Sequence, residues 1–230
     1  MQLFGQTIPI PDTIRRVKID VGLGMHNVQS IQWLKHDRDL FVFMFEPNPV
    51  CIESCVGRMC EEGPTFSANG NEVCILPFAV ADVSGVVDMP FYAMWVDGGT
   101  SSLFLPTDPT LGLIAGLHVV QACPLRLLFE AFPWDRIPWI DYLKVDVQGG
   151  DLAVLRSAGP WLAERVVYVT AEPESTAYAG CEGNTEEAIT AYMTAQGFER
   201  IVHSNTCDPT FVNLRFKGEV ADAVYIYQQN

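Results

Sequence analysis

Basic residues are scarce in this sequence. Its 230 residues include 14 Lys and Arg against 28 Asp and Glu, which gives a formal net charge of −14. A nucleic-acid partner requires a basic face, so this balance argues against DNA or RNA binding. It suits a neutral or cationic ligand, although acidity also serves solubility.

Long apolar runs are missing as well. The apolar stretch over residues 41–45 is too short to cross a bilayer and is typical of a buried strand. The first residues, 1–5, lack the basic start and the apolar core of a signal peptide. We therefore expect no membrane association and a cytoplasmic location.

The seven cysteines are odd in number and scattered through the chain. Cys51, Cys55 and Cys60 suggest a metal site at first. However, Cys51, Cys55 and Met59 recur at every fourth position, on one face of a predicted helix. We therefore predict small core residues rather than metal ligands, and a reducing compartment is favoured.

What is present indicates one α/β domain. Hydrophobic residues make up 49% and charged residues 18%, as in a globular chain with a large core. Strand patterns alternate with helix patterns, which predicts a doubly wound, mostly parallel sheet with helices on both faces. Predicted strands cover residues 17–21, 39–45, 72–78, 140–147, 165–170, 198–203, 211–216 and 223–227. Predicted helices cover residues 25–36, 49–60, 125–132, 151–158 and 185–196.

Two segments stand apart from this alternation. Residues 1–16 are predicted as a lead-in to a single domain over 1–230. Residues 86–95 alternate loosely, as in an added hairpin or edge strand, and 103–121 are poorly patterned. We therefore interpret 86–121 as an insertion that covers the site. The helix from 49 is expected to end near residue 60, because Glu-Glu-Gly-Pro follows at 61–64.

The stretch from Val17 to Gly24 predicts a buried strand, a glycine turn and then a helix. Gly22 and Gly24 allow a tight turn and close approach to a ligand, and the helix N-terminus points at it. Four further acidic residues end other predicted strands. Parallel strands end at one rim, where such sheets bind ligands, so we expect a polar cleft there. The five residues are Asp20, Glu46, Asp82, Asp146 and Glu172; each alone is equally explained as a cap or loop residue.

A nucleoside cofactor without phosphates fits this rim. Glu46 ends the second strand, where an acidic residue can accept both ribose hydroxyl protons. Asn27 breaks the three-glycine pattern of a dinucleotide turn, and no phosphate-loop lysine follows. S-adenosylmethionine remains, and its positive sulfonium suits acidic neighbours.

Four motifs resemble the FkbM-type methyltransferases over roughly residues 17–175. The strand-four motif is the most specific of them, and the helix over 151–158 and Glu172 continue the pattern. The motifs are Lys-Ile-Asp-Val-Gly at 18–22, Phe-Glu-Pro-Asn-Pro at 45–49, Ala-Val-Ala-Asp at 79–82 and Ile-Asp-Tyr-Leu-Lys-Val-Asp-Val-Gln-Gly at 140–149.

The resemblance implies a Rossmann-like class I methyltransferase that uses S-adenosylmethionine. Family members typically methylate hydroxyl groups of sugars or small metabolites, and such domains occur fused to other sugar-modifying domains such as glycosyltransferases. The resemblance places the cofactor's methionine part at Asp20, Gly22 and Gly24, and its ribose at Glu46. It places the adenine beside Ala81 and Asp82, with Asp146 near the transferred methyl group.

The family usually has Glu at the position of Gln148, and a glycine near His26. An acceptor hydroxyl must still lose a proton, and a carboxylate or imidazole would take it. Asp146 is favoured as that base, and His118 comes second because the insertion would carry it over the cleft. His26 and Glu172 are further candidates. We expect the catalytic group to contain Asp146, His118 and Gln148.

Several alternatives remain open from the residues alone. Trp95, Trp134 and Trp139 could stack on a sugar or fill the core equally well. Magnesium could bind Asp146 and neighbouring carboxylates, as in some related enzymes, although no ligand spacing requires a metal. A nicotinamide-dependent oxidoreductase could share the fold. Gln148 also keeps open a degenerate module that binds a glycan or partner without catalysis.

Overall fold

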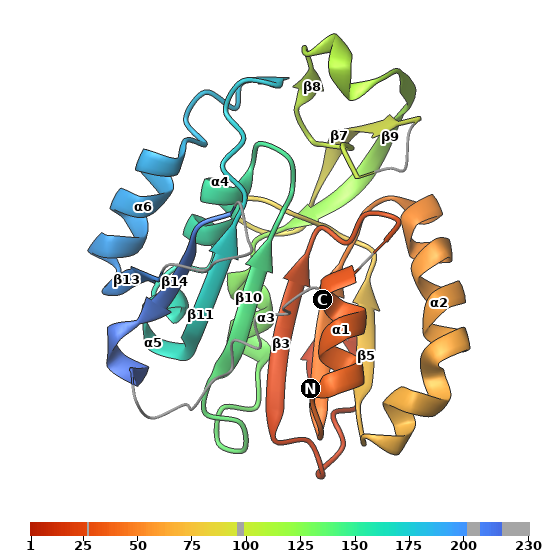
Figure 1. Ribbon diagram of the computed structural model, residues 1–230, viewed down its shortest axis with the longest axis vertical. Helices are drawn as coiled ribbons and strands as arrows, with labels where there is room; N and C mark the ends of the chain where they lie inside the picture. Colours follow the sequence, from red (N-terminus) through yellow and green to blue (C-terminus); the bar gives the residue numbers. More distant parts are fainter. Residues whose placement is uncertain (27, 96–98, 202–207, 218–230) are drawn as a thin grey trace.

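The computed structural model describes residues 1–26, 28–95, 99–201 and 208–217. In this part of the chain the main sheet has seven strands in the order β13-β14-β11-β10-β3-β4-β5 (Figure 1). The five strands from β11 to β5 in this order run parallel to one another, whereas β14 is antiparallel to both β11 and β13. The strands are β3 (Arg16–Val21), β4 (Leu40–Phe45), β5 (Glu72–Leu76), β10 (Ile140–Val145), β11 (Val166–Ala171), β13 (Phe198–Ile201) and β14 (Thr210–Asn213).

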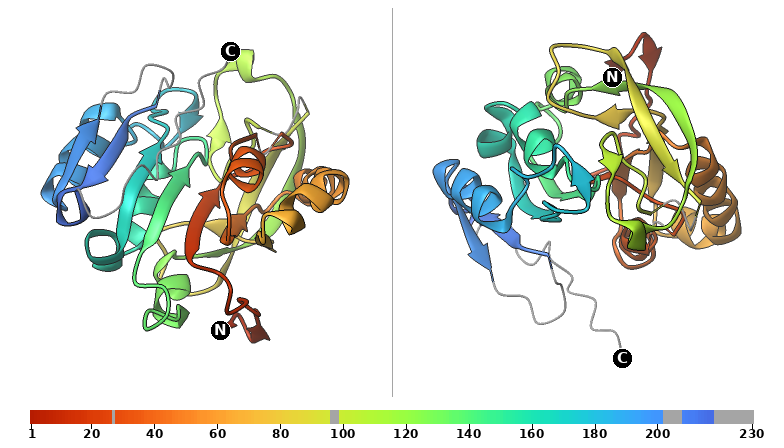
Figure 2. Two further views of the ribbon diagram at one scale, coloured as in Figure 1. Left: turned by 60° about the horizontal axis from the view of Figure 1, so that its bottom comes forward. Right: turned by 90° about the horizontal axis from the view of Figure 1, so that it is seen from above.

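Helices cover both faces of this sheet, which confirms the predicted doubly wound α/β architecture. The alternating residues of β4 show why. Phe41, Phe43 and Phe45 pack into one core with α3 to α6, and Leu40, Val42 and Met44 pack into a second core with α1 and α2. Figure 2 shows α2 and α6 at opposite flanks of the sheet. The helices are α1 (Val28–His36), α2 (Pro49–Ala68), α3 (Arg126–Ala131), α4 (Asp151–Ser157), α5 (Trp161–Arg165) and α6 (Glu186–Ala195).

Helix α2 is longer than the sequence pattern predicted. Asn48 caps it and Pro49 opens it as expected, but the helix continues through Gly63 and Pro64 to Ala68. The prediction of an end near Cys60 was therefore wrong. Phe66 is buried in the second core, and this anchor stabilises the last turns beyond the proline.

The segment 86–121 forms a small sheet of its own beyond the carboxyl ends of the main strands (Figure 1). In this sheet β9 pairs with β7 in antiparallel and with β6 in parallel direction. The short strands β8 and β12 pair with each other in a separate two-stranded sheet. Residues 103–121 were expected to be irregular, yet most of β9 lies there. Its outward residues Leu117 and Val119 are apolar, which hides the alternation of a half-buried strand. The strands are β6 (Ala79–Val80), β7 (Val87–Met94), β8 (Leu105–Pro106), β9 (Ile114–Cys123) and β12 (Tyr178–Ala179), and a 3-10 turn covers Pro109–Leu111.

The two ends of the chain add minor elements. Residues 1–16 contain a short hairpin, β1 (Gln2–Leu3) and β2 (Gln6–Thr7), and a 3-10 turn over Leu214–Phe216 follows β14. The strand predicted at 223–227 lies outside the described residues, as does the end of the one predicted at 198–203. Across the described ranges, no helix combines the length and apolar character that a membrane span needs.

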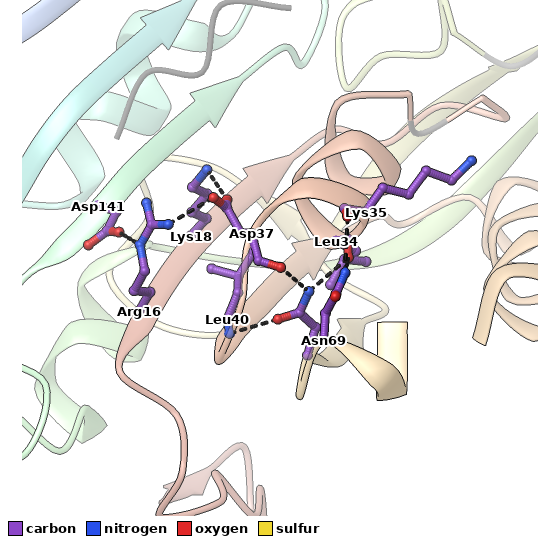
Figure 3. A network of polar contacts seen from close by, with 9 residues as sticks. Arg16, Lys18, Leu34, Lys35, Asp37, Leu40, Asn69 and Asp141 are labelled. Carbon is purple, nitrogen blue, oxygen red and sulfur yellow. Dashed lines mark hydrogen bonds and ion pairs between the residues drawn. The ribbon is translucent and has the colours of Figure 1, made fainter. Parts of the chain in front are cut away.

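A closed cluster of charges lies at the amino ends of β3, β4 and β10 (Figure 3). Lys18 is fully buried and its Nζ lies 2.6 Å from Asp37. Arg16 contacts Asp37 at 2.8 Å and Asp141 at 2.6 Å. Two cations thus meet two buried carboxylates, and Asn69 and Asn71 bind nearby carbonyls of α1 and the turn after it. We call these four residues, Arg16, Lys18, Asp37 and Asp141, the amino-end cluster.

Candidate functional site

A cavity of about 340 Å³ lies at the opposite, carboxyl end of the strands. Backbone and side chains at the ends of β3, β4 and β10 form its floor, and the segment 86–104 adds apolar walls. The lining includes Gly22, Gly24, His26, Phe45, Glu46, Phe78, Ala81, Asp82, Met89, Phe91, Ser101, Leu103, Phe104, Asp146, Gln148 and Gly150.

The glycine turn after β3 brings bare backbone to this cavity. Gly22 has φ +85°, and a Cβ on it would lie 1.8 Å from the carbonyl oxygen of Asp146. The Asp146 N–H in turn donates to the Val21 carbonyl at 2.9 Å. Gly24 has φ +56° and also lines the cavity. Residue 22 must therefore be glycine for the turns after β3 and β10 to touch.

Glu46 closes the turn from the side of β4. Its carboxylate accepts the N–H groups of Leu23 and Gly24 at 3.1 Å each, and that of Asn48 at 2.8 Å. Burial raises the pKa of Glu46 to about 7, against the opposing effect of these three donors and of Lys144. The sequence prediction placed Glu46 at this rim, and the structure places it in the cavity wall.

Asp20 does not line the cavity. It is buried, and it accepts a hydrogen bond from the Ser30 hydroxyl and one of 3.2 Å from Lys144 Nζ. The side chain of a strand residue alternates between the faces of the sheet, and Asp20 faces α1 instead of the rim. The expected contact of Asp20 with a cofactor is therefore not supported by its position.

Lys144 joins the glycine turn to Asp146. Its Nζ donates to the Gly22 carbonyl at 3.0 Å and lies 3.4 Å from Asp146 Oδ2. Burial lowers the pKa of Lys144, but the charges of Asp20 and Asp146 outweigh it and the net shift is upward. Burial likewise raises the pKa of Asp146, and Lys144 together with donors from Glu172 and Gln148 turns the net shift downward.

The turn after β10 gathers further acids around Asp146. Burial, followed by the negative charge of Asp146, raises the pKa of Asp151 to about 7 and also raises that of Glu172. Gln148 lies between Asp146 and Glu172, and its Nε2 donates to both. Negative charge therefore exceeds positive charge at this end of the sheet.

The cavity brings together most of the residues predicted from the sequence. Seven of them line it, and His26 does as well. The seven are Gly22, Gly24, Glu46, Ala81, Asp82, Asp146 and Gln148. Glu172 lies behind Gln148 and is not in the lining.

His118 was expected over the cleft, but it is exposed on β9 and does not line the cavity. Its partner across the strands is Phe91 of β7. The ring of Phe91 is buried, and Phe91 lines the cavity where His118 does not. Trp95 is exposed, Trp134 stacks on Trp161 at the edge of the first core, and Trp139 packs on Phe216. None of the three tryptophans reaches the cavity lining as described. Its aromatic residues are Phe45, Phe78, Phe91 and Phe104.

Two kinds of site residue escaped the sequence analysis. Lys144 had a signal, because a lysine inside a strand that is buried on both faces needs an acidic partner. Met89, Leu103 and Phe104 had none, since their segment showed no pattern. For metals, no group of three His, Cys, Asp or Glu side chains in the described ranges has the arrangement of a metal site.

Comparisons with known proteins were informative at the level of the family. The model of the methyltransferase FkbM domain matches residues 25–200. No curated protein matches. Among solved structures, the METTL16 MTase domain shows 12% identity and a TM-score of 0.44 over 86% of this chain and 59% of that one. The N-terminal domain of human METTL16 in complex with SAH shows 11% identity and a TM-score of 0.42, over 87% of this chain and 62% of that one. A human methyltransferase 10 domain containing protein shows 10% identity and a TM-score of 0.41, over 88% of this chain and 73% of that one. The chain thus spans about three fifths of the two METTL16 chains.

Proposed function

The chain belongs to the methyltransferase FkbM domain family, and from this premise we propose that it transfers a methyl group from S-adenosylmethionine to a hydroxyl of a saccharide or other small metabolite. The observation that carries the proposal is the cavity itself. It joins the glycine turn to three carboxylates from different strand ends, namely Glu46, Asp82 and Asp146.

The lining suits a cationic nucleoside without phosphates. Among the described residues that form it, none is Lys or Arg, so a pyrophosphate would find no counter-charge there. The positive φ of Gly24 leaves bare backbone toward the cavity, which gives room for an amino acid moiety. Apolar walls such as Met89 and Phe91 suit a flat base. These features support S-adenosylmethionine as the cofactor.

The positions of the lining residues support a proposal for their individual roles. We assign the ribose hydroxyls to Glu46, whose carboxylate is already fixed by three backbone donors. We assign the adenine edge to Ala81 and Asp82, and the methionine part to Gly22 and Gly24. Asp20 and Lys144 act behind this surface: they hold the turn and Asp146 in place.

The bound cofactor supplies an electrophilic methyl group. The protein's part is to align the acceptor and to take its proton, because in-line transfer depends largely on positioning. Asp146 faces the cavity, and its lowered pKa keeps it ionised at neutral pH. We propose that this carboxylate accepts the hydroxyl proton as the acceptor oxygen attacks.

Two alternatives are weaker. A nicotinamide cofactor needs a site for two phosphates, which this acidic lining does not offer. A degenerate binding module would keep the cavity without catalysis, and Gln148 is the departure from the family pattern that motivated it. The proposed acceptor remains a neutral sugar, glycan or small molecule. A cytoplasmic location and cooperation with glycosyltransferase domains are further proposals.

The test is calorimetric titration followed by an acceptor screen. We expect 1:1 binding of S-adenosylmethionine and, with a panel of glycans and small alcohols, a product heavier by one methylene group in mass spectrometry. NADH should not bind. Cofactor binding without turnover on any acceptor would favour the degenerate module, and absence of cofactor binding at millimolar concentration would overturn the proposal.

A further inference from the structure

Every hydrogen-bonding group of the Gln148 amide has a partner. Its Nε2 donates to Asp146 Oδ1 at 2.8 Å and to Glu172 Oε2. Its Oε1 lies 3.0 Å from the hydroxyl of Tyr178, a residue that is only 2% exposed. An amide saturated in this way has one orientation, because a flipped amide would turn its oxygen toward two carboxylates.

The backbone also holds Gln148 in an unusual conformation. Its φ is +59°, in the left-handed region that side-chain-bearing residues rarely adopt, and Gly149 follows with φ +98°. The Ser102 hydroxyl donates to the Gln148 carbonyl at 2.7 Å and so connects the turn to the segment 86–121. Strain of this kind persists where the surroundings over-determine it, often at functional sites.

Two carboxylates share one NH₂ group at this point. Asp146 and Glu172 both accept from Gln148, and their side chains also contact one another. Close carboxyl groups repel unless a proton or a cation lies between them, and the raised pKa of Glu172 means that Glu172 carries the proton of this pair. The two N–H groups of the amide bind both side chains, and Lys144 lies 3.4 Å from the other oxygen of Asp146. The amide therefore fixes the direction of the ionised Asp146 carboxylate.

We propose that Gln148 is a positioning residue for methyl transfer, which holds the Asp146 carboxylate ionised and turned toward the cationic centre of the cofactor. This inference rests on the proposed function and deepens it. Gln148 itself transfers no proton. In the step it serves, the acceptor oxygen forms a bond to the methyl carbon, the carbon–sulfur bond breaks and its electron pair stays on sulfur. The hydroxyl proton passes to Asp146.

The experiment compares two ligands that differ in charge at one atom. S-adenosylmethionine carries the positive sulfonium, and S-adenosylhomocysteine lacks both methyl group and charge. We define the preference as the ratio of their Kd values from calorimetry at neutral pH. A residue that only stabilises the fold changes both Kd values together, whereas a residue that aims a carboxylate at the sulfonium changes their ratio.

Gln148→Leu keeps the size of the side chain and removes its donors. Without them Asp146 is free to swing onto Lys144, so we expect the preference for S-adenosylmethionine to fall about fivefold, with the Kd of S-adenosylhomocysteine within about twofold. Gln121→Leu is the matched control, because it makes the same exchange at an exposed position on β9 outside the cavity lining. We expect it to leave the preference within about twofold of the unaltered chain.

Tyr178→Phe serves if Gln148→Leu does not fold. It keeps the ring and removes the hydroxyl, which contacts both the Gln148 amide and the Thr100 carbonyl, so the preference should fall in the same direction by about fourfold. An equal change in both Kd values, or an unchanged preference in both Gln148→Leu and Tyr178→Phe, would overturn the inference. If the unaltered chain binds neither ligand, the proposed function fails and this inference fails with it; binding of both with an unmoved ratio refutes the inference alone.

Discussion

The two ends of the central sheet carry opposite kinds of charge cluster. At the amino end, Arg16 and Lys18 meet Asp37 and Asp141 at 2.6 to 2.8 Å, and the charges balance. At the carboxyl end, Lys144 faces a surplus of carboxylates, which are Asp20, Asp146, Asp151 and Glu172.

The difference separates a structural cluster from a binding site. Buried charges that satisfy one another need no ligand, although removing one partner is costly. A surplus of buried acids raises the pKa values of some of these acids, and a bound cation in the adjoining cavity would balance their charge. Lysine and aspartate occur at both ends, so the charge balance and the adjoining cavity distinguish the two clusters, and the residue types alone do not.

The strongest way to break the carboxyl end is Gly22→Ala. A Cβ there would meet the Asp146 carbonyl at 1.8 Å, so the two turns must separate. We expect S-adenosylmethionine affinity to fall roughly a hundredfold or more. Gly57→Ala in α2 is the control, because its added methyl group meets open space. Calorimetry measures both, and unchanged affinity in Gly22→Ala would show that the turn does not hold the cofactor.

Lys18→Met breaks the amino end. It leaves Asp37 buried with Arg16 as its remaining partner in the cluster, and we expect a loss of about 3 kcal/mol in the free energy of unfolding. Cofactor affinity should stay within about twofold, since the cluster lies at the far end of the sheet. Lys35→Met is the control; its ion pair with Glu62 is partly exposed and worth about 0.5 kcal/mol. Urea denaturation measures the stability. A large loss of affinity in folded Lys18→Met would contradict the separation of the two ends.

Glu46→Gln tests one carboxylate of the cavity wall. The amide keeps one acceptor oxygen where the carboxylate has two, so contacts with backbone donors and with the ribose are lost. We expect cofactor affinity to fall about tenfold. Glu199→Gln on β13 removes an exposed carboxylate and should change nothing measurable. Equal affinity for both variants would remove Glu46 from the binding site.

The surplus of acids also predicts a pH dependence of stability. The pKa values of Glu46 and Asp151 rise to about 7, and that of Glu172 rises as well, so the folded protein binds protons more tightly than the unfolded chain. Stability is then largest below the unfolded pKa values and falls as pH rises. Urea midpoints should decrease from about pH 5 to about pH 8, and Glu172→Gln should flatten the upper part of the curve. A midpoint that increases over this range would contradict the assignment.

The smallest effect is expected at His118. It is exposed on β9 and outside the cavity lining, so His118→Ala should leave cofactor affinity and turnover within about twofold of the unaltered chain. Trp95→Ala, on the same added segment, is a suitable companion. A strong loss of turnover in His118→Ala would mean that β9 moves onto the acceptor.

The predictable parts of the molecule are those that local pattern determines. The strand 17–21, the glycine turn and the acidic strand ends follow from β-branched residues, from glycine and from the topology of parallel sheets. Glu46 and Asp146 were placed at the cavity for that reason. The family match over residues 25–200 agrees with the resemblance and contains three of its four motifs, since the motif at 18–22 precedes the match.

The remainder depends on tertiary contacts. Helix α2 passes Pro64 because Phe66 is buried against a distant strand. Asp20 turns away from the rim because Ser30 and Lys144 bind it. The positions of the cavity-wall residues in the segment 86–104 depend on the pairing of β7 with β9. This pairing joins residues far apart in the sequence, so it produces little local sequence pattern. None of these features could be read from neighbouring residues.

The most direct test of the account is a pair of titrations of the unaltered chain, one with S-adenosylmethionine and one with NADH. The account predicts 1:1 binding of S-adenosylmethionine, weakened by Glu46→Gln, and no binding of NADH. Binding of NADH instead, or of neither ligand at millimolar concentration, would contradict the claim that the acidic end of the sheet accommodates an adenosyl sulfonium.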